Sequence, residues 1–296
     1  MRILILCLLI ILLRTNISEC QDLPNTNVYL LQIEQVDSIL TFTSPQFLTQ
    51  FNAKGYNNQP SFLSNTELMM SVGLENANQT DIYLFDLEKK TRLRMTKTPE
   101  SEYSPQVTPE NLFFSVVRVE TDEGRSQRVW QYPLDRKDKG RPVFKYLRGI
   151  GYYYWLDRFR VALFNVADVN YLSLGDTRDE ATRHLAPSVG RSFQKSPNGR
   201  LVFVHKITEG NWVIKAMDTN TLEVETIVPA LPGCEDFVIL KDGTILMGKG
   251  SRLYQFHPRK DTTWREVAEL NNLGIFHITR LAASSDGKLA IVNGGE

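Results

Sequence analysis

The chain has 296 residues, enough for one large hydrophobic core or two small ones. Lysine plus arginine and aspartate plus glutamate each number 34, so the formal net charge is zero. This balance argues against a nucleic-acid-binding protein, which normally carries a basic excess, and no long segment has the composition of a disordered region.

The N-terminus has the pattern of an export signal. Arg2 precedes an apolar run, Ile3 to Leu13, which is the length of a signal-peptide core and too short to span a membrane as a helix. We therefore predict a signal peptide over residues 1–20 and a periplasmic or extracellular protein; a short N-terminal membrane anchor is the alternative. Ile17-Ser-Glu-Cys20 weakly resembles a lipoprotein box, so for a cleaved, exported chain we expect a membrane contact only through a lipid on Cys20.

The cysteines predict neither a disulfide framework nor a metal site. Cys7 lies in the predicted signal peptide, which leaves at most Cys20 and Cys234 in the mature chain. Two cysteines so far apart have no Cys-x-x-Cys metal spacing. Buried apolar surface must therefore hold the core together.

A strand-like segment recurs along the whole chain. Its clearest copies are Asn27-Val-Tyr-Leu-Leu-Gln-Ile-Glu34, Asp81-Ile-Tyr-Leu-Phe-Asp-Leu-Glu88 and Arg128-Val-Trp-Gln-Tyr-Pro-Leu-Asp135. Weaker copies begin at Asn170 and Trp212, and successive copies lie roughly 40 to 50 residues apart, a period typical of β-propeller blades.

A second repeated unit, a turn followed by an apolar strand, precedes each later copy. Its turns lie near Asn65, Glu110, Arg158, Asn198, Asp242 and Asp286. Several carry Asn-Gly or Asp-Gly, the preferred pairs of two-residue hairpin turns.

The two repeats are out of phase at the chain ends. The strand at Asn27 has no turn–strand unit before it, and the unit at Asp286 has no strand after it. We therefore predict an all-β, six-bladed β-propeller over residues 21–296, as one domain, closed by pairing Val28 to Thr43 with the C-terminal strands. An open stack of hairpins or a two-sheet sandwich is the alternative. The only segments with helix-like spacing are 48–52 and 264–270.

These residues resemble the TolB-like, WD40-like (PD40) six-bladed propellers of exported bacterial proteins. The resemblance rests on Glu102-Tyr-Ser-Pro-Gln-Val-Thr-Pro-Glu-Asn111, Asp81-Ile-Tyr-Leu-Phe-Asp-Leu87, Ser196-Pro-Asn-Gly199 and Ser285-Asp-Gly-Lys288. It covers roughly residues 27 to 293 and implies the propeller fold. It does not imply one function, because such propellers serve as scaffolds, partner-binding domains and substrate filters.

The sequence contains none of the common catalytic motifs. Gly-x-Ser-x-Gly, His-Glu-x-x-His, the P-loop and the EF-hand loop are absent, and the four histidines are widely spaced. We predict no catalytic residue, metal site or cofactor. Asn78-Gln-Thr80 is a glycosylation sequon by pattern and marks an exposed loop.

The segments that lead into the innermost strand of each blade are the candidate site. They should meet around the propeller axis on one face and line a surface for a protein partner or a small polar ligand. The residues predicted to bind there are Glu102, Tyr103, Tyr153, Arg191, Glu235, Asp236, His277 and Arg280. The alternative is that these side chains only fill and hydrate the mouth of the channel.

Two rival functions remain open from sequence. A calcium-dependent, lactonase-like propeller hydrolase could hold Ca²⁺ with the oxygen atoms of Asn57, Glu102, Glu235 and Asp236. A structural scaffold of an envelope complex would need no ligand.

Overall fold

The computed structural model describes residues 23–36, 39–122 and 124–295. The predicted signal peptide and Cys20 lie outside the described residues. Within them, no helix is long and apolar enough to cross a membrane.

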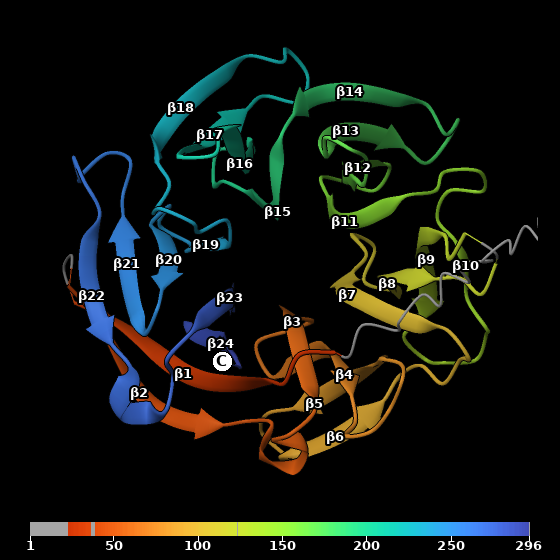
Figure 1. Ribbon diagram of the computed structural model, residues 1–296, viewed down its shortest axis with the longest axis horizontal. Helices are drawn as coiled ribbons and strands as arrows, with labels where there is room; N and C mark the ends of the chain where they lie inside the picture. Colours follow the sequence, from red (N-terminus) through yellow and green to blue (C-terminus); the bar gives the residue numbers. More distant parts are fainter. Residues whose placement is uncertain (1–22, 37–38, 123, 296) are drawn as a thin grey trace, which may run out of the picture.

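The described chain forms six antiparallel four-stranded sheets, arranged as blades around an axis (Figure 1). From the innermost strand outward, blade 1 has β3 (Tyr56–Phe62), β4 (Glu67–Gly73), β5 (Asp81–Asp86) and β6 (Thr91–Arg94); blade 2 has β7 (Ser101–Val107), β8 (Phe113–Val119), β9 (Gln127–Pro133) and β10 (Arg141–Pro142). Blade 3 has β11 (Ile150–Trp155), β12 (Arg160–Asn165), β13 (Tyr171–Asp176) and β14 (Thr182–Pro187); blade 4 has β15 (Val189–Lys195), β16 (Leu201–Thr208), β17 (Asn211–Met217) and β18 (Val224–Pro229). Blade 5 has β19 (Phe237–Ile239), β20 (Ile245–Lys249), β21 (Arg252–Phe256) and β22 (Arg265–Glu269); blade 6 has β23 (Ile278–Ala283), β24 (Lys288–Gly294), β1 (Thr26–Val36) and β2 (Ile39–Phe47).

Blade 6 combines strands from both ends of the described chain. β1 pairs antiparallel with β24 in an unbroken register from Thr26 opposite Gly294 to Gln32 opposite Lys288. The all-β, six-bladed fold class predicted from the repeats is confirmed.

The hydrophobic core lies between the blades rather than at the axis. Six apolar clusters fill the six interfaces between neighbouring blades, each with residues from both blades. The second strand of each blade is therefore buried on both faces: Leu68, Leu246 and Ala290 have no exposed surface. This explains why these strands are continuous apolar runs without polar alternation.

One expectation about helices is wrong. The segment 264–270, which has helix-like spacing, contains the strand β22, whereas 48–52 does contain a short 3-10 helix, η1 (Gln50–Asn52). β22 is the outermost strand of blade 5 and none of its residues is buried, so pairing with β21 decides its conformation.

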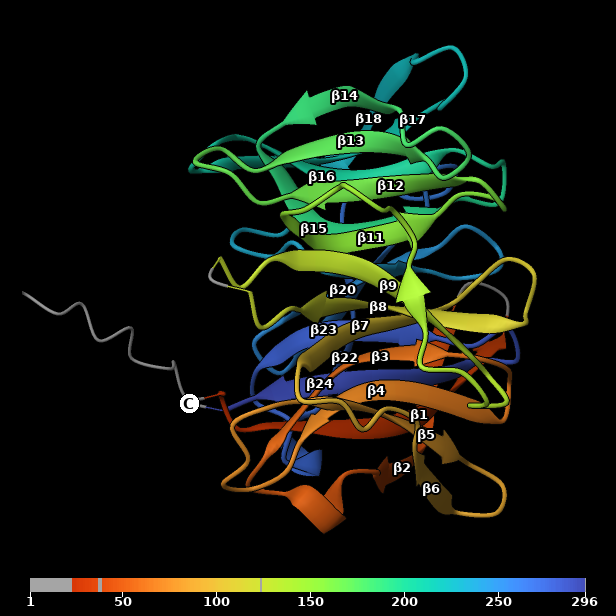
Figure 2. The same ribbon diagram turned by 90° about the vertical axis from the view of Figure 1, so that its right-hand side faces the viewer.

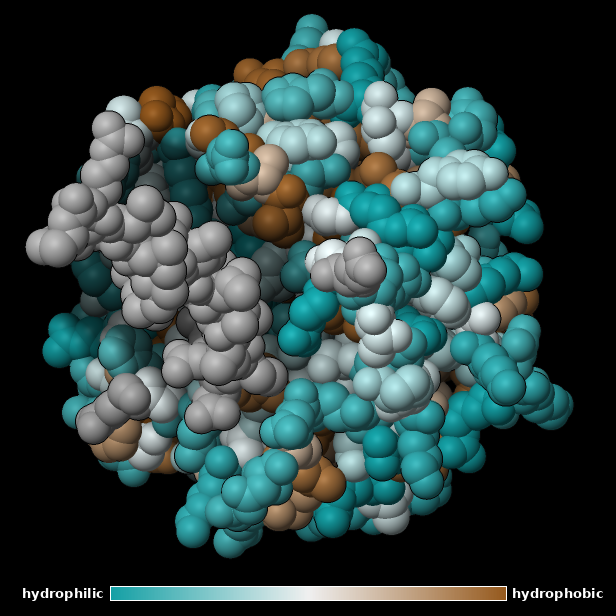
Figure 3. Space-filling view, turned by 45° about the vertical axis from the view of Figure 1, so that its right-hand side comes forward, coloured by the Kyte–Doolittle hydropathy of each residue, from teal (hydrophilic) through white to brown (hydrophobic). Residues whose placement is uncertain are grey.

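The strands run roughly along the axis of the ring, as a side view shows (Figure 2). All six innermost strands begin at the same end, where the turns between the second and third strands also lie. We call this end the axial face. Seen obliquely from the side of β9 and β10, the surface is mainly hydrophilic, with hydrophobic residues in small separate groups (Figure 3).

Candidate functional site

The six innermost strands surround a channel along the axis. Residues of β3, β7, β11, β15 and β23, together with Asp236 and Val238 at β19, line a cavity of about 490 Å³. A space of this size can hold a small organic ligand.

One position in the innermost strands supplies the main polar groups of the channel. Tyr152, Arg191 and Arg280 are each the third residue of their strand, in β11, β15 and β23. Each of these strands has an irregular register with its neighbour close to that residue. Bulges of this kind redirect side chains, and all three residues line the channel.

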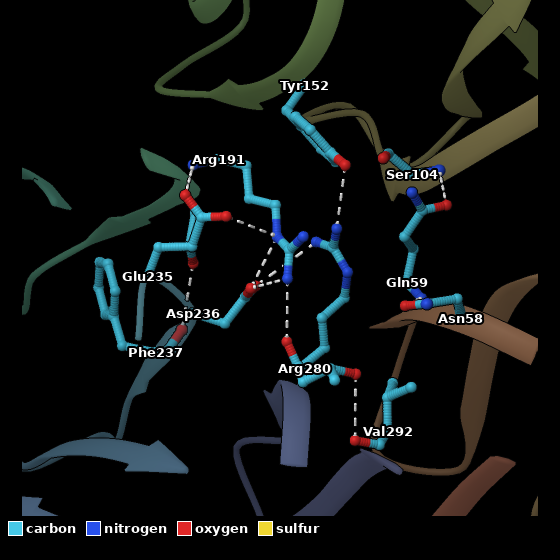
Figure 4. Close-up of polar contacts among 12 residues, drawn as sticks. Asn58, Gln59, Ser104, Tyr152, Arg191, Glu235, Asp236, Phe237, Arg280 and Val292 are labelled. Atoms are coloured by element: carbon cyan, nitrogen blue, oxygen red, sulfur yellow. Dashed lines mark hydrogen bonds and ion pairs between the residues drawn. The ribbon is translucent and has the colours of Figure 1, made fainter. Parts of the chain in front are cut away.

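The two arginines meet at one carboxylate (Figure 4). Arg191 contacts Asp236 Oδ2 through Nη2 at 2.6 Å and Nε at 2.8 Å. Arg280 Nη1 lies 3.5 Å from Asp236 Oδ1, and its Nη2 donates to the Tyr152 hydroxyl at 3.2 Å. Arg191 also donates to the Thr279 carbonyl at 3.2 Å. Groups from four blades are thus joined across the axis.

A second carboxylate extends this cluster toward the axial face. Glu235 accepts an ion pair from Lys206 at 2.6 Å and lies 3.4 Å from Arg191 Nε. Burial acts to lower the pKa of Arg191, but the carboxylates of Asp236 and Glu235 outweigh it and hold that pKa above its ordinary value. With Arg280, three cations face two carboxylates, so the cluster carries one net positive charge.

The cluster separates the channel from a second cavity at the axial face. This mouth cavity has a volume of about 520 Å³ and shares Arg191, Asp236 and Arg280 with the channel. His277, which is exposed, and Glu235 line the mouth. Of the predicted residues, Arg191, Glu235, Asp236, His277 and Arg280 therefore do come together.

Tyr103 lies beside the channel but lines neither cavity. It is half-buried, and its ring packs edge-on against Tyr56 with 6.2 Å between the ring centroids. Burial raises the pKa of Tyr56, and the positive charge of Arg280 opposes that rise, which places the aromatic pair close to the arginine cluster.

The prediction that Glu102 lines the channel is wrong. Glu102 is the second residue of β7 and has no exposed surface, because its side chain points away from the side taken by Tyr103. Its carboxylate accepts hydrogen bonds from Thr98 and, at 3.1 Å, from Thr96, while the Tyr132 hydroxyl lies 3.4 Å away. Burial raises the pKa of Glu102 to about 7.

Tyr153 borders the channel, but its side chain is turned away from it. Its side chain is buried between blades 2 and 3, and its hydroxyl bonds to the Ser104 carbonyl at 3.0 Å and to Ser115 Oγ at 2.9 Å. The neighbouring Tyr152 faces the channel instead. Tyr152 has the same position in its strand as Arg191 and Arg280 in theirs. Comparing this position between the blades would have identified Tyr152 from the sequence.

Ser104 is a further channel residue that was missed. It precedes Pro105 as Gln59 precedes Pro60, at matching positions of β7 and β3, and both residues have a positive φ. Both line the channel, where the Gln59 side chain accepts from the Ser104 amide at 2.9 Å. The Ser104 hydroxyl oxygen is buried without a hydrogen-bond partner, which is uncommon in folded proteins.

The four oxygen ligands suggested for Ca²⁺ are not gathered. The Asn57 side-chain amide donates to the carbonyls of Thr26 at 2.8 Å and Asn52 at 2.9 Å, and Glu102 is held by its threonines. In the part of the chain that the structure describes, no group of three or more His, Cys, Asp or Glu residues could hold a metal ion.

Neither a protein-family profile nor a curated protein matches this chain. Solved structures do match. TolB from Acinetobacter baumannii has 13% identity and a TM-score of 0.57, over 92% of this chain and 64% of that one, so this chain spans less than two thirds of its length. The structure of a nidogen/laminin complex matches with 9% identity and a TM-score of 0.61, over 90% and 98%.

An enzyme is also among the matches. Oligogalacturonate lyase from Vibrio parahaemolyticus has 10% identity and a TM-score of 0.53, over 92% of this chain and 98% of that one. At such identities the likeness concerns the fold alone. The chain is a TolB-like six-bladed β-propeller in its architecture.

Proposed function

We propose that this protein is an exported, non-catalytic binding module whose axial channel takes a small polar ligand with an acidic group. The observation that carries the proposal is the convergence of Arg191, Arg280 and Tyr152, from three blades, on one channel of about 490 Å³.

The fold itself does not require these groups. The core lies between the blades, so apolar or small residues could occupy the third position of each innermost strand. Two guanidinium groups held side by side repel each other, and one carboxylate, Asp236, serves both. The 3.5 Å contact of Arg280 with it is long for a charged hydrogen bond, so a ligand carboxylate would improve the pairing of Arg280.

Binding without catalysis is supported by the pairing of the two carboxylates in the arginine cluster. Glu235 is paired with Lys206 and Asp236 with Arg191, at 2.6 Å each. Both carboxylates are thus already in contact with cations of the protein itself, which leaves neither of them free to approach a proton of a bound substrate.

Export is proposed from the sequence of Arg2 and the apolar run Ile3 to Leu13. A periplasmic or extracellular location would give the channel access to ligands outside the cytoplasm.

A partner protein is the second candidate occupant, favoured by the composition of the axial face. Phe276 precedes β23, and Val166 and Val169 lie in the turn between β12 and β13, all at this end of the strands. They are 60%, 53% and 58% exposed. Exposed apolar side chains around a polar mouth are typical of protein-binding surfaces, and a partner's acidic side chain could enter the channel.

Thermal melting in the presence of carboxylates tests the proposal. Acetate, succinate and citrate, each compared with its amide, should raise the melting temperature of the wild type and leave the Arg191→Gln, Arg280→Gln double variant unchanged. The control is Arg178→Gln, Arg252→Gln, which removes the same charge from exposed arginines of outer blade regions. Equal stabilisation of both double variants would place the site elsewhere, and no stabilisation of the wild type would remove the proposal of a small acidic ligand.

A further inference from the structure

A third cavity lies on the rim of the propeller, between blades 1 and 2, which are adjacent in the ring (Figure 1). Its volume is about 380 Å³. The connection from β6 to β7 forms one wall, and β8, β9 and the turn after β9 form the other. It shares no residue with the channel or the mouth cavity, so it is independent of the function proposed above.

The floor of this rim cavity is apolar. Met95 and Tyr132 are both buried, and they belong to the cluster between blades 1 and 2. Pro99 and Pro133 continue the apolar lining toward the surface. Such a floor can cover a ring-sized apolar body and remove it from water.

The rim of the cavity is strongly basic in a chain of zero net charge. Four basic residues, Lys97, Arg118, Arg136 and Lys139, line it against two acidic ones, Glu100 and Asp138, an excess of two positive charges. Among the described residues, no carboxylate lies within ion-pairing distance of Lys97, Arg136 or Lys139. These three side chains are exposed and free to contact an anion.

The wall also contains polar atoms that lack partners. Glu100 and Arg118 form an ion pair of 2.6 Å, and their side chains are only 10% and 14% exposed. Glu100 Oε2 and Arg118 Nε are nevertheless buried without a hydrogen-bond partner. Buried polar atoms are rarely left in this state, and a small shift of the two side chains would be needed to bring these atoms into contact with a bound molecule.

We propose that the rim cavity binds an amphipathic organic anion, an apolar ring-sized body that carries a carboxylate or a similar acidic group. The body lies on Met95, Tyr132 and the prolines. The acidic group faces Lys97, Arg136 and Lys139, and a polar substituent reaches the Glu100–Arg118 pair. The combination of an apolar floor and a basic rim selects this class over a purely polar or purely apolar ligand.

Calorimetric titration with three probes tests the proposal. Naphthalene-2-carboxylate has both the body and the charge, naphthalene-2-carboxamide has only the body, and acetate has only the charge. We expect the carboxylate to bind the wild type more tightly than the other two. The Lys97→Gln, Lys139→Gln variant should weaken it roughly three- to thirtyfold, as expected for two exposed charge pairs.

The matched control is Lys54→Gln, Lys137→Gln, which removes the same charge. Lys54 and Lys137 are exposed, each pairs with an acid of its own, and Lys137 lies in the same turn as Lys139 but outside the cavity. Equal affinity of the two double variants, or equal binding of carboxylate and amide, would overturn the proposal. Loss of binding only in Arg191→Gln, Arg280→Gln would assign the probe to the axial channel and overturn it as well, as would no binding of the carboxylate to the wild type.

Discussion

Replacing Glu102 by glutamine should stabilise the protein at alkaline pH. The carboxyl group is fully buried, and its pKa rises from 4.5 to about 7. Burial is the largest cause of this rise and the charge of Asp81 adds to it, while hydrogen bonds from Thr98 and Thr96 oppose it. Between these two values the folded protein keeps a proton that the unfolded chain releases. Stability therefore falls as the pH rises through this window and stays low above it.

The magnitude follows from the pKa values. One pH unit is worth about 1.4 kcal/mol, so a rise from 4.5 to about 7 costs about 3 kcal/mol at pH 8 and less than about 1 kcal/mol at pH 5. Glutamine is neutral, has nearly the same shape and cannot release a proton in the unfolded state. Glu102→Gln should thus gain up to about 3 kcal/mol at pH 8, which for a chain of this size corresponds to a melting temperature higher by roughly 5–10 °C.

Denaturant unfolding of wild type and Glu102→Gln at pH 5 and pH 8 measures this effect. Glu88→Gln, at an exposed glutamate, is the control and should change stability by less than about 0.5 kcal/mol at either pH. If Glu102→Gln were less stable than wild type at pH 8, the carboxylate would be ionised and stabilised by its threonines, and the reasoning from burial would be refuted.

Three further predictions concern the fold. Phe114→Ala should lower the free energy of unfolding by about 3–5 kcal/mol, because it opens a cavity between blades 1 and 2. Phe276→Ala at the exposed axial face should change it by less than about 0.5 kcal/mol. Equal losses in denaturant unfolding would contradict the buried core. Tyr153→Phe should lower the free energy of unfolding by about 1–2 kcal/mol, because the Tyr153 hydroxyl makes two hydrogen bonds. Tyr152→Phe should lower it less, because the Tyr152 hydroxyl has one partner in the channel. The reverse order would contradict the placement of the two side chains. Leu30→Pro, in the middle of β1, should cost about 3 kcal/mol or more by breaking the pairing with β24, and an unchanged melting curve would argue against that pairing.

The architecture could be predicted because it repeats. Each blade has a second strand buried on both faces and a turn before it, so six copies of one pattern appear in the sequence. The unmatched strand at Asn27 and the unmatched unit at Asp286 pointed to a shared blade, and β1 does pair with β24.

The site could be predicted only in part, because the side of a strand that faces the channel depends on local register. Glu102 and Tyr153 each lie one residue from a side chain on the channel side, and a shift of one residue reverses the face. Bulges in the innermost strands set that register, and the sequence gives no direct sign of most of them. The prediction did succeed for Arg191, Asp236 and Arg280. Charged side chains at these positions are not needed for packing in the core between the blades, which is why they indicated a site.

Hydrogen–deuterium exchange, read peptide by peptide, tests the binding role of the channel most directly. The protein would be measured with and without the carboxylate that raises its melting temperature most. The account predicts slower exchange at the starts of β11, β15 and β23 and in residues 234–239, and no change in the Arg191→Gln, Arg280→Gln variant. Protection confined to other segments, or equal protection in the double variant, would contradict it.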